Sequence, residues 1–553
     1  MTEHRPPGVE ARGGRFPGPS LIPELNAIQG RLGWLPREDL EQLARSTRRP
    51  RYEIEGLISF YPHFRTSPPP KVQVSVCRDL PCWLRNGGAD TLCEPADADV
   101  EIVEVSCLGR CDIAPAAAVN EHPASVADLP GLMLEAHAGT LPAARARGRE
   151  LPWPNDPYPA GSTLAERYRT LRARLAGELT DDQILAALKE SGLRGMGGAG
   201  FPTGTKWELV RAAEGTPKYA ICNADESEPG TFKDRQILAT QPNLVLEGLL
   251  LGMIVVGAEQ GWVFIRHEYA PEEHVLRTEI AALRAAGVIG PDACGSGRTL
   301  EIDVFVSPGG YILGEETALL ECMEGHRGEP RNKPPFPGNY GLHGRPTLMN
   351  SVETFADVPI IVQHGPQAWR EVGIGDSVGW KFVAVSGHVK RPDVYCVPAG
   401  TPVRELIELA GGVLGDARVA AVQPGGASSN FLSPDRLDVG LDFGPLAAAG
   451  SMLGSGALVV LAEGTDLLAA ATNVLRFFRN ESCGKCVPCR VGSTKAHEIL
   501  QASLEAGRSL DPGQRARIFE LEEVMRKTSI CGLGQVALGP VVSVLHLGDR
   551  TEI

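Results

Sequence analysis

The sequence predicts a multidomain protein of the α/β class. Its 553 residues are too many for one hydrophobic core, which indicates three or four domains. The spacing of apolar residues changes from a helical period to strict alternation and back, so helices and strands occur in separate stretches. A proline-rich segment at 141–163 divides the chain further, and we interpret it as a linker.

Composition excludes two classes of partner. The net charge is −14, and because no sustained basic patch is present, nucleic acid is not expected to bind. No apolar run is long enough to span a bilayer, and residues 1–20 lack the apolar segment of a secretory signal. We expect those residues to form a disordered arm, and we expect a cytoplasmic protein whose cysteines stay reduced or bind metal.

The first folded part is expected at 21–140. Apolar residues recur at helical spacing between residues 21 and 64, which predicts three or four short helices. Alternating residues at 71–76 ("KVQVSV") and at 100–105 ("VEIVEV") predict two strands.

The larger part is expected at 164–375, as an α/β domain with glycine-rich loops and helices that include 181–191 and 244–256. Strand, helix and strand patterns follow in quick succession at 376–440, which predicts a small β-grasp-like module. The remainder, 441–553, is expected to be helical, most clearly from residue 465 onward.

Three cysteines fall within seven residues of "ESCGKCVPCR", namely Cys483, Cys486 and Cys489. Thiolates at this spacing can reach three irons of one [4Fe–4S] cluster, and a fourth thiolate can be distant in sequence. Cys531 in "SICGLG" is the candidate for the fourth ligand, since the intervening helices could fold back. A structural zinc site is the alternative, but zinc sites favour two similar pairs of ligands.

A second set comprises Cys77 and Cys82, then Cys107 and Cys111, and each pair follows one of the two predicted strands. Adjacent strand ends would bring the four thiolates together. The unequal spacings of four and three residues suit a [2Fe–2S] cluster better than zinc. Disulfides are a further alternative, which a reducing compartment disfavours.

The stretch "GLRGMGGAGFPTGTKWE" contains Gly195, Gly197 and Gly200 in a G-x-G-x-x-G arrangement. The dinucleotide-binding fingerprint requires a preceding strand, but a helical pattern precedes this loop. Its backbone N–H groups could still approach a phosphate, with Lys206 as a nearby cation, or the loop could be a tight structural turn.

Two acidic stretches favour a binding site. "CNADESEPGTFKDR" places Asp225, Glu226 and Glu228 beside Asn223, and "GGYILGEETALLECMEG" places two carboxylates after a glycine loop. Those two, Glu315 and Glu316, could also be no more than charges that complement a helix dipole.

Together these stretches resemble a known family. Residues 164–545 resemble the flavoprotein (NADH-binding) subunit of respiratory complex I, and residues 21–139 resemble its small thioredoxin-like [2Fe–2S] subunit, fused in front. The motifs that carry the resemblance are the glycine loop, "NADESEPGT", "GEETALLE", "KPPFP" and "ESCGKCVPCR". The resemblance implies a thioredoxin-like [2Fe–2S] domain within 21–140, an FMN- and NAD(H)-binding domain at 164–375, and a helical [4Fe–4S] domain at 441–553.

The resemblance also implies site residues. The phosphate end of FMN would be held by Gly195, Gly197 and Lys206. Its ribityl chain or ring would be contacted by Asn223, Asp225, Tyr311, Gly314, Glu315 and Asn350. The same eight cysteines match the ligands of the two clusters.

For NAD(H), the resemblance implies a site lined by Phe201, Glu228, Glu316, Lys333 and Phe336. Glu228 and Glu316 would be the catalytic pair, orienting the nicotinamide amide and shaping the local charge. The chain departs from the family at Leu209, where an aromatic is common, and at Ser351, where an asparagine is usual. We therefore expect weaker adenine stacking and the loss of one flavin contact.

The implied activity is that of a diaphorase, an oxidoreductase that passes electrons between NAD(H) and iron–sulfur clusters through FMN. The fused arrangement resembles NAD-reducing hydrogenases and molybdenum- or tungsten-dependent formate dehydrogenases more than typical complex I, and the overall pattern most resembles the β subunit of NAD-dependent formate dehydrogenases. A partner with a Mo/W-pterin centre and its own clusters would then oxidise formate in a hetero-oligomer. A NAD-reducing hydrogenase and a complex I-like enzyme are alternatives, and a non-catalytic relay scaffold is an alternative of another class.

Overall fold

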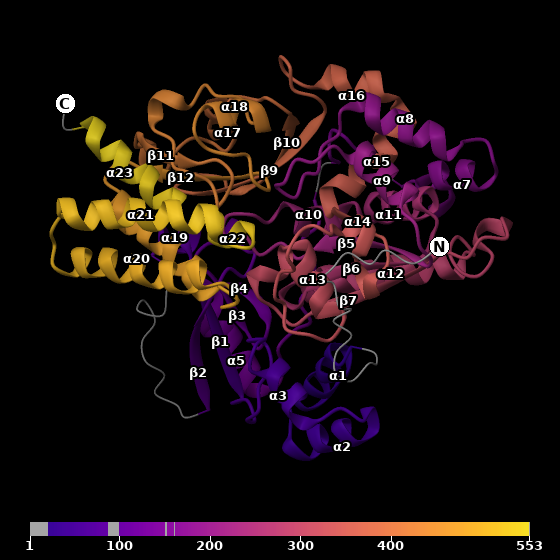
Figure 1. Cartoon of the computed structure of the whole chain (residues 1–553), viewed down its shortest axis with the longest axis horizontal. Coiled ribbons are helices and arrows are strands. Elements are labelled where there is room, and N and C mark those ends of the chain that lie inside the picture. The colour runs from indigo at the N-terminus through magenta and orange to yellow at the C-terminus, as the bar shows by residue number, and fades with distance from the viewer. Residues whose placement is uncertain (1–19, 87–98, 150–151, 160, 552–553) are drawn as a thin grey trace, which may run out of the picture.

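The computed structural model describes residues 20–86, 99–149, 152–159 and 161–551. Within these ranges the chain forms three four-stranded sheets with helices packed around them, which confirms the predicted multidomain α/β class. Figure 1 shows the sheet of β1 and β2 at the base, the central sheet of β5–β7 above it, and the C-terminal helices along one side. The predicted arm at 1–20 lies outside the described residues, apart from Ser20.

The predicted N-terminal helices form a small lobe. They are α1 (Ile22–Leu32), α2 (Arg37–Thr47) and α3 (Arg51–Ile58). The C-cap of α1 is Gly33, whose φ of 78° lies in the left-handed region that glycine adopts without strain. The lobe is tied to the central domain because Asn26 Nδ2 donates to the carbonyl of Val306 at 3.0 Å and Tyr61 Oη donates to that of His326 at 2.6 Å.

The first sheet has the order β2-β1-β3-β4. Both predicted strands are present, as β1 (Val72–Cys77) and β2 (Val100–Val105), and they pair in parallel with Cys77 opposite Val105. The other elements of this domain are α4 (Leu80–Trp83), β3 (Ala116–Val119), β4 (His122–Ser125) and α5 (Leu129–Ala138). Since parallel strands end at the same edge, the loops that follow β1 and β2 lie side by side.

The central sheet is entirely parallel, with the order β7-β6-β5-β8. Its strands are β5 (Lys218–Ala224), β6 (Ala258–Arg266), β7 (Glu301–Ser307) and β8 (Thr347–Ser351). The helices of this domain are α6 (Leu164–Arg167), α7 (Arg169–Leu175), α8 (Asp181–Ser191), α9 (Thr203–Ala212), α10 (Lys233–Thr240), α11 (Pro242–Val256), α12 (Ala270–Ala285), α13 (Glu316–Met323), α14 (Pro337–Tyr340), α15 (Val352–His364) and α16 (Pro366–Val372).

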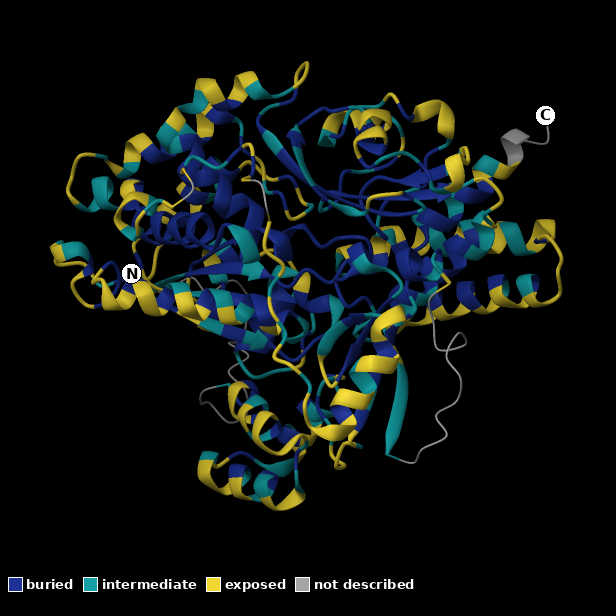
Figure 2. Ribbon diagram, turned by 180° about the vertical axis from the view of Figure 1, so that it is seen from behind, coloured by how far each residue is buried: buried dark blue, intermediate teal, exposed yellow. Residues whose placement is uncertain are grey.

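Helix α11 forms the centre of this domain. Every one of its residues is buried, and it packs against α15 and β6. Figure 2 shows the buried residues running through the central sheet and its neighbours, with exposed residues on the outer helices. A helix that is apolar on all sides fits only such a position.

The expected linker at 141–163 does not lie free in its described part. The Trp153 side chain is 3% exposed, stacks edge-on against Phe382 at 4.9 Å between centroids, and donates from Nε1 to Thr240 at 2.8 Å. The segment therefore packs between the central domain and the module that follows.

The module has a sheet of order β10-β9-β12-β11. Its elements are β9 (Trp380–Gly387), β10 (Asp393–Pro398), α17 (Val403–Leu409), β11 (Val419–Gln423), α18 (Phe443–Ala448) and β12 (Ala457–Ala462). The expected boundary at 440 is too early, because β12 lies between β9 and β11 and completes this sheet. Strand β12 reads "ALVVLA", and an apolar run this short does not distinguish a buried strand from a helix.

The C-terminal part is helical, with α19 (Leu467–Asn480), α20 (Val487–Glu505), α21 (Pro512–Thr528), α22 (Gly532–Val536) and α23 (Gly539–Thr551). Helix α20 packs against α19 and α21. Helices α20 and α21 lie side by side (Figure 1), and α21 returns the chain toward the start of α20, where Gly492 faces Met525. Among the described residues, no single helix is both long and apolar enough to cross a bilayer; α10 and α11 meet that test only as a pair, bent by 95°.

The crossing of α11 and α15 provides a test of the packing. A Cβ at Gly248 would lie 1.9 Å from the carbonyl oxygen of Phe355, whereas nothing lies within 4 Å of a Cβ at Gly30 in α1. We expect Gly248→Ala to destabilise the protein by about 1–3 kcal/mol through overpacking and to lower the apparent Tm by roughly 2 °C or more. Gly30→Ala is the matched control, and thermal unfolding should show it to be neutral or slightly stabilising.

Candidate functional site

The predicted loops meet where the strand order of the central sheet reverses. Strands β5, β6 and β7 follow one another in one direction, whereas β8 lies on the other side of β5. Asn223 and Ser351, at the carboxyl ends of β5 and β8, are register partners across this point. Open parallel sheets bind ligands outside the carboxyl ends of their strands at such a switch point. The topology therefore marks this position, which we call the crevice, as the candidate binding site.

The glycine loop covers this crevice. It lies between α8 and α9, and a helix rather than a strand precedes it, as the sequence predicted. The N–H of Gly195 donates to the carbonyl of Phe201 at 2.8 Å, which closes the loop. A Cβ at Gly197 would lie 3.2 Å from Cβ of Ser351, and one at Gly200 would lie 2.9 Å from the Phe443 ring. Close approach of the backbone therefore requires glycine at Gly200, whose φ is 63°.

Two side chains of α9 contact the end of β8. Lys206 Nζ donates to the carbonyl of Met349 at 3.1 Å, and Trp207 Nε1 donates to Oδ1 of Asn350 at 3.0 Å. Burial lowers the pKa of Lys206. Trp207 uses one of the two lone pairs of this amide oxygen and so fixes the orientation of the Asn350 amide, whose NH2 group can donate to a ligand.

Asp225 follows β5 directly and is 7% exposed. Its N–H donates to Oδ1 of Asn223 at 3.1 Å, and Nδ2 of Asn223 donates to the carbonyl of Gly314 at 2.9 Å. Oδ2 of Asp225 is buried and has no hydrogen-bond partner among the described residues. Burial raises the pKa of Asp225 to about 8. A buried acceptor without a partner at the switch point fits a ligand that carries hydroxyl or ring N–H donors, as FMN does.

Glu228 and Tyr311 are brought together across the crevice. Tyr311 Oη donates to Oε2 of Glu228 at 2.5 Å, and the N–H of Ser428 donates to Oε1 of Glu228 at 2.6 Å. Burial raises the pKa of Glu228. The loop after β5, the loop after β7 and the small module are thus joined through one carboxylate.

The pair Glu315 and Glu316 takes two different positions. Glu315 caps α13, accepting at Oε2 from the N–H groups of Thr317 and Ala318 at 2.9 Å, so the helix-terminus interpretation holds for this residue. Lys333 Nζ lies 2.8 Å from Oε1 of Glu315 and 2.8 Å from Oε1 of Glu316. Two carboxylates and one ammonium group therefore form a single cluster beside the crevice.

The predicted aromatic residues lie at the surface. Phe201 is 43% exposed and Phe336 is 56% exposed, on segments that precede α9 and α14 respectively. These two helices pack together, since Gly338 of α14 lies against Val210 of α9. Leu209, which stands where the family often has an aromatic, is 57% exposed on α9.

The first cysteine set converges as predicted. All four thiols are buried, and the Cys107 and Cys111 sulfurs lie 3.8 Å apart. Contact with the thiols of Cys111 and Cys77 lowers the pKa of Cys107 well below its usual value, and Cys77 is in contact with Cys82 as well. Four buried sulfurs in mutual contact fit a [2Fe–2S] cluster.

The second set converges too. Cys486 is the N-cap of α20, and Cys489 lies in its first turn. Cys531 is the N-cap of α22, which packs on α20; a Cβ at Gly534 would lie 2.9 Å from that of Cys489. Burial raises the pKa of Cys531 to about 12, and the nearby Cys483 adds to the shift. The expected return of Cys531 to the C-x2-C-x2-C loop is thereby observed, which fits a four-thiolate cluster.

Sequence reasoning missed the residues that connect these parts. Glu481 accepts from Ser106 Oγ at 2.5 Å and from the N–H of Tyr311 at 2.9 Å, and so joins the first cysteine loop to the crevice. Arg266 donates to the carbonyls of Cys107 and Glu226, both at 2.6 Å. An acidic residue two positions before Cys483 was the one available signal; nothing local marks Arg266.

Family models match four parts of the chain. They are a thioredoxin-like [2Fe–2S] ferredoxin at 17–129, the Nuo51 FMN-binding domain at 188–360, an SLBB domain at 382–431, and the NADH-ubiquinone oxidoreductase-F iron–sulfur binding region at 469–547.

Similar proteins include the F 2 subunit of the NADH-quinone oxidoreductase of Rhizobium meliloti, 44% identical over 68% of this chain and 90% of the relative. The corresponding F subunit of Mycobacterium bovis is 40% identical over 70% of this chain and 87% of its own. The chain belongs to the family of NADH-quinone oxidoreductase F subunits.

As a member of this family, the chain is an NAD(H) oxidoreductase subunit of the diaphorase type, and the predicted FMN, [2Fe–2S] and [4Fe–4S] cofactors are confirmed. The family resemblance seen in the sequence is likewise confirmed. Two further similarities extend beyond the quinone-linked enzymes. The HndC subunit of the NADP-reducing hydrogenase of Solidesulfovibrio fructosivorans is 40% identical over 66% of this chain and 74% of its own. A chain of a NAD+-reducing [NiFe]-hydrogenase structure superposes with a TM-score of 0.84 at 31% identity, over 96% of this chain and 91% of that chain.

The raised pKa of Asp225 gives a testable pH dependence. Its pKa of about 8 in the folded protein lies above the ordinary 3.8, so the folded state binds the extra proton between these values. The free energy of unfolding must therefore fall as pH rises through this window. In flavin-free protein, the apparent Tm of Asp225→Asn should fall less than that of the wild type between about pH 5 and pH 8. Asp182→Asn, at an exposed aspartate, should follow the wild type; identical slopes for all three proteins would contradict the interpretation.

Proposed function

We propose that the crevice at the switch point holds FMN and that NAD(H) binds in front of it. The proposal is carried by the features that meet at the crevice, namely the glycine loop and Oδ2 of Asp225, which has no hydrogen-bond partner among the described residues. The two cysteine sets, which we call the cysteine nests, lie next to it, because Arg266 and Glu481 connect them to the loops of the crevice. A diaphorase needs a nucleotide site and two cluster sites held at fixed positions relative to one another, because electrons pass between them.

For FMN, we assign the phosphate end to the backbone N–H groups around Gly195 and Gly197, with Lys206 as the cation. Asn223, Asp225 and the NH2 group of Asn350 would hold the polar parts of the ribityl chain and ring, together with the backbone around Gly314 and the Tyr311 side chain. Glu315 would contribute less directly, because one of its oxygens caps α13.

For NAD(H), we assign the outer part of the site to the exposed Phe201 and Phe336 and to Lys333. Glu228 and Glu316 would orient the nicotinamide amide, Glu228 from inside the crevice and Glu316 from its edge. The exposed Leu209 offers no aromatic face to adenine, which agrees with the expected weaker stacking.

When bound, FMN exchanges electron pairs with nicotinamide and single electrons with iron–sulfur clusters. The chain's own residues position the two rings, exclude water and hold charge; no side chain needs to move a proton for hydride transfer. Tyr311 supports this role because it fixes Glu228 through its hydroxyl and is itself held by Glu481.

For the partner, we propose a formate-oxidising subunit with a Mo/W-pterin centre, in a hetero-oligomer that reduces NAD+. Support comes from the overall pattern of the chain, which resembles formate dehydrogenase β subunits. The fused arrangement of the [2Fe–2S] and flavin domains is shared with NAD-reducing hydrogenases and does not distinguish the two. A hydrogen-oxidising partner is the second candidate, favoured by the superposition of nearly the whole chain on one from a NAD+-reducing [NiFe]-hydrogenase.

The role of Glu316 can be tested by Glu316→Ala. Loss of this carboxylate leaves Lys333 paired with Glu315 alone and removes a nucleotide contact. The KM for NADH in a dye-reduction assay should rise about tenfold, equivalent to about 1.4 kcal/mol, while flavin content stays unchanged. Glu208→Ala, at an exposed residue of α9 that pairs with Lys189, is the control. Unchanged steady-state kinetics for NADH in Glu316→Ala would refute the assignment.

The partner can be identified by purifying the tagged chain from its native cells with the subunits that accompany it. NAD+ reduction should be measured with formate and with hydrogen, and NADH oxidation with a quinone, alongside molybdenum, tungsten and nickel content. Formate-dependent NAD+ reduction in a preparation that contains molybdenum or tungsten is the expected result. Hydrogen-dependent reduction with nickel, or quinone reduction alone, would replace the formate proposal while leaving the diaphorase intact.

A further inference from the structure

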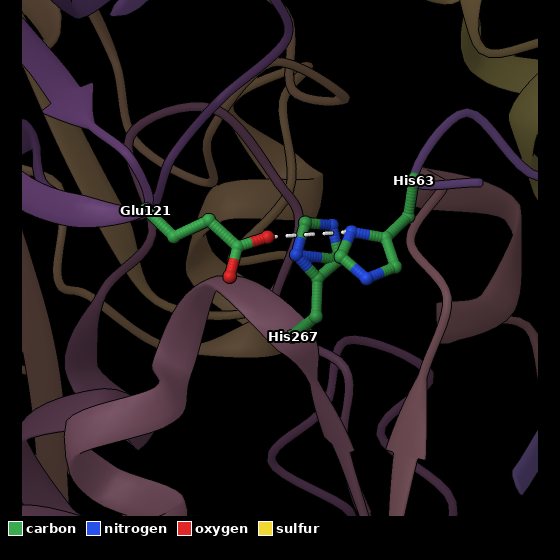
Figure 3. Close-up of side chains that lie close together, drawn as sticks. All are labelled: His63, Glu121 and His267. Atoms are coloured by element: carbon green, nitrogen blue, oxygen red, sulfur yellow. Dashed lines mark ion pairs between the residues drawn. The ribbon is translucent and has the colours of Figure 1, made fainter. Parts of the chain in front are cut away.

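Three potential metal ligands meet at the junction of three parts of the chain, and none of them belongs to the two cysteine sets or to the residues assigned to FMN and NAD(H). They are His63, between α3 and β1; Glu121, in the turn between β3 and β4; and His267, directly after β6. One ligand atom from each lies within 4.8 Å of the other two. Figure 3 shows the carboxylate of Glu121 directed at the two imidazoles, with the His63 Nδ1 to Glu121 Oε1 contact at 3.6 Å.

The chain segments that carry His63 and Glu121 have fixed backbone conformations. Gln29 of α1 donates from Nε2 to the His63 carbonyl at 2.6 Å and accepts at Oε1 from the N–H of Arg65 at 2.8 Å, so one side chain fixes the loop on both sides of His63. Glu121 has a φ of 66°, in a left-handed turn position where glycine is usually preferred. A glutamate at this position is held at the hairpin tip at some conformational cost.

His267 is the fixed member of the set. The preceding Arg266 is anchored to the carbonyls of Cys107 and Glu226. Nδ1 of His267 is buried and has no hydrogen-bond partner among the residues that the structure describes. Gly309 leaves room for the ring, since a Cβ there would lie 3.0 Å from Nε2 of His267.

We propose that His63, Glu121 and His267 bind a divalent transition-metal ion of the zinc type. Two imidazoles and one carboxylate are a ligand set that Zn²⁺ takes, with water in the fourth position. Zinc–ligand bonds of about 2.0–2.1 Å place tetrahedral ligands roughly 3.3 Å apart, so the set closes by a small movement. The His63 ring lies 4.0 Å from the His267 ring between centroids, tilted by 30°. Metal binding would turn the His63 ring on its loop and move Glu121, whose side chain is 65% exposed, toward the ion.

A second group of potential metal ligands differs from the first because an arginine already pairs with its carboxylates. Glu321, Glu324 and His326 also lie within ligand distance of one another. However, Arg331 places its guanidinium 2.6 Å from Glu321 and 2.8 Å from Glu324, so both carboxylates are already neutralised. This group is an ion-pair network and serves as the internal control. At the first group the nearby Arg266 is paired with Glu268 at 2.6 Å, and Glu268 also lies 3.6 Å from Nε2 of His267. Among the described residues Glu121 has only His63 as an ion-pair partner, which leaves its carboxylate for the metal.

Such an ion would join the N-terminal helical lobe, the hairpin of the [2Fe–2S] domain and the central domain at one point. These three parts carry one ligand each, so the site exists only when all three are docked. The ion therefore has a structural role: it stabilises the docking of the [2Fe–2S] domain.

The test uses the full chain with flavin and both clusters loaded. Zn²⁺ is added in the presence of a competing chelator, the protein is desalted anaerobically, and zinc is measured by mass spectrometry. We expect one zinc per chain with iron content unchanged. X-ray absorption at the zinc edge should show nitrogen and oxygen neighbours at about 2.0–2.1 Å rather than sulfur at about 2.3 Å, which excludes zinc in a cysteine nest.

Substitutions at the proposed ligands test whether the bound zinc lies at this site. His63→Ala and Glu121→Gln should each weaken zinc binding at least tenfold while iron and flavin content stay unchanged, and His326→Ala in the control group should bind zinc like the wild type. Absence of bound zinc, a sulfur environment, or unchanged affinity in His63→Ala would overturn the proposal. NADH oxidation does not enter these readouts, so the result is independent of the proposed substrate and partner.

Discussion

The buried guanidinium of Arg266 is the interaction on which the relation between the domains depends. Arg266 is 2% exposed, donates to the carbonyls of Cys107 and Glu226, and forms an ion pair with Glu268. A buried cation costs several kcal/mol unless its donors are satisfied, and here two backbone carbonyls and a carboxylate satisfy them. The same side chain thus stabilises the loop that carries two cluster ligands and the loop that borders the crevice. Neither loop can shift without leaving a buried guanidinium N–H of Arg266 without its acceptor.

Two further buried arginines reinforce this junction. Arg110, three residues after Cys107, makes a bidentate pair with Glu272 at 3.1 and 3.0 Å, and Arg235 pairs with Asp112 at 2.7 Å. In each case one partner belongs to the [2Fe–2S] domain and the other to the central domain. Removal of Glu272 would leave the Arg110 guanidinium in a low-dielectric interface without its carboxylate, which is why buried pairs specify a single docked arrangement more than they add stability.

Features that depend on residues close together in the sequence were predicted correctly, whereas contacts between distant segments were missed. Cys483, Cys486 and Cys489 lie within seven residues, and the two cysteine pairs follow alternating strands, so local spacing predicted both nests. The order of elements from 164 to 375 likewise indicated an α/β domain. By contrast, β12 joins a sheet whose other strands lie more than thirty residues upstream, and Glu481 acts on Ser106 and Tyr311 across the fold. The residue pattern within one segment cannot predict such long-range contacts, because they depend on how distant segments pack against one another.

Protonation resolves an apparent conflict in the charge of the crevice. The crevice that we propose for FMN and NAD(H) should not be acidic, because both ligands are anionic, yet the carboxyl groups of Asp225 and Glu228 border it. Burial raises the pKa of both groups, to about 8 for Asp225, so that near neutral pH Asp225 is largely a neutral acid and can donate as well as accept. Lys333 meanwhile compensates the charge of Glu315 and Glu316 at the edge. The crevice therefore contains many carboxyl groups but carries little net negative charge. These groups can form hydrogen bonds with an anionic ligand without repelling it.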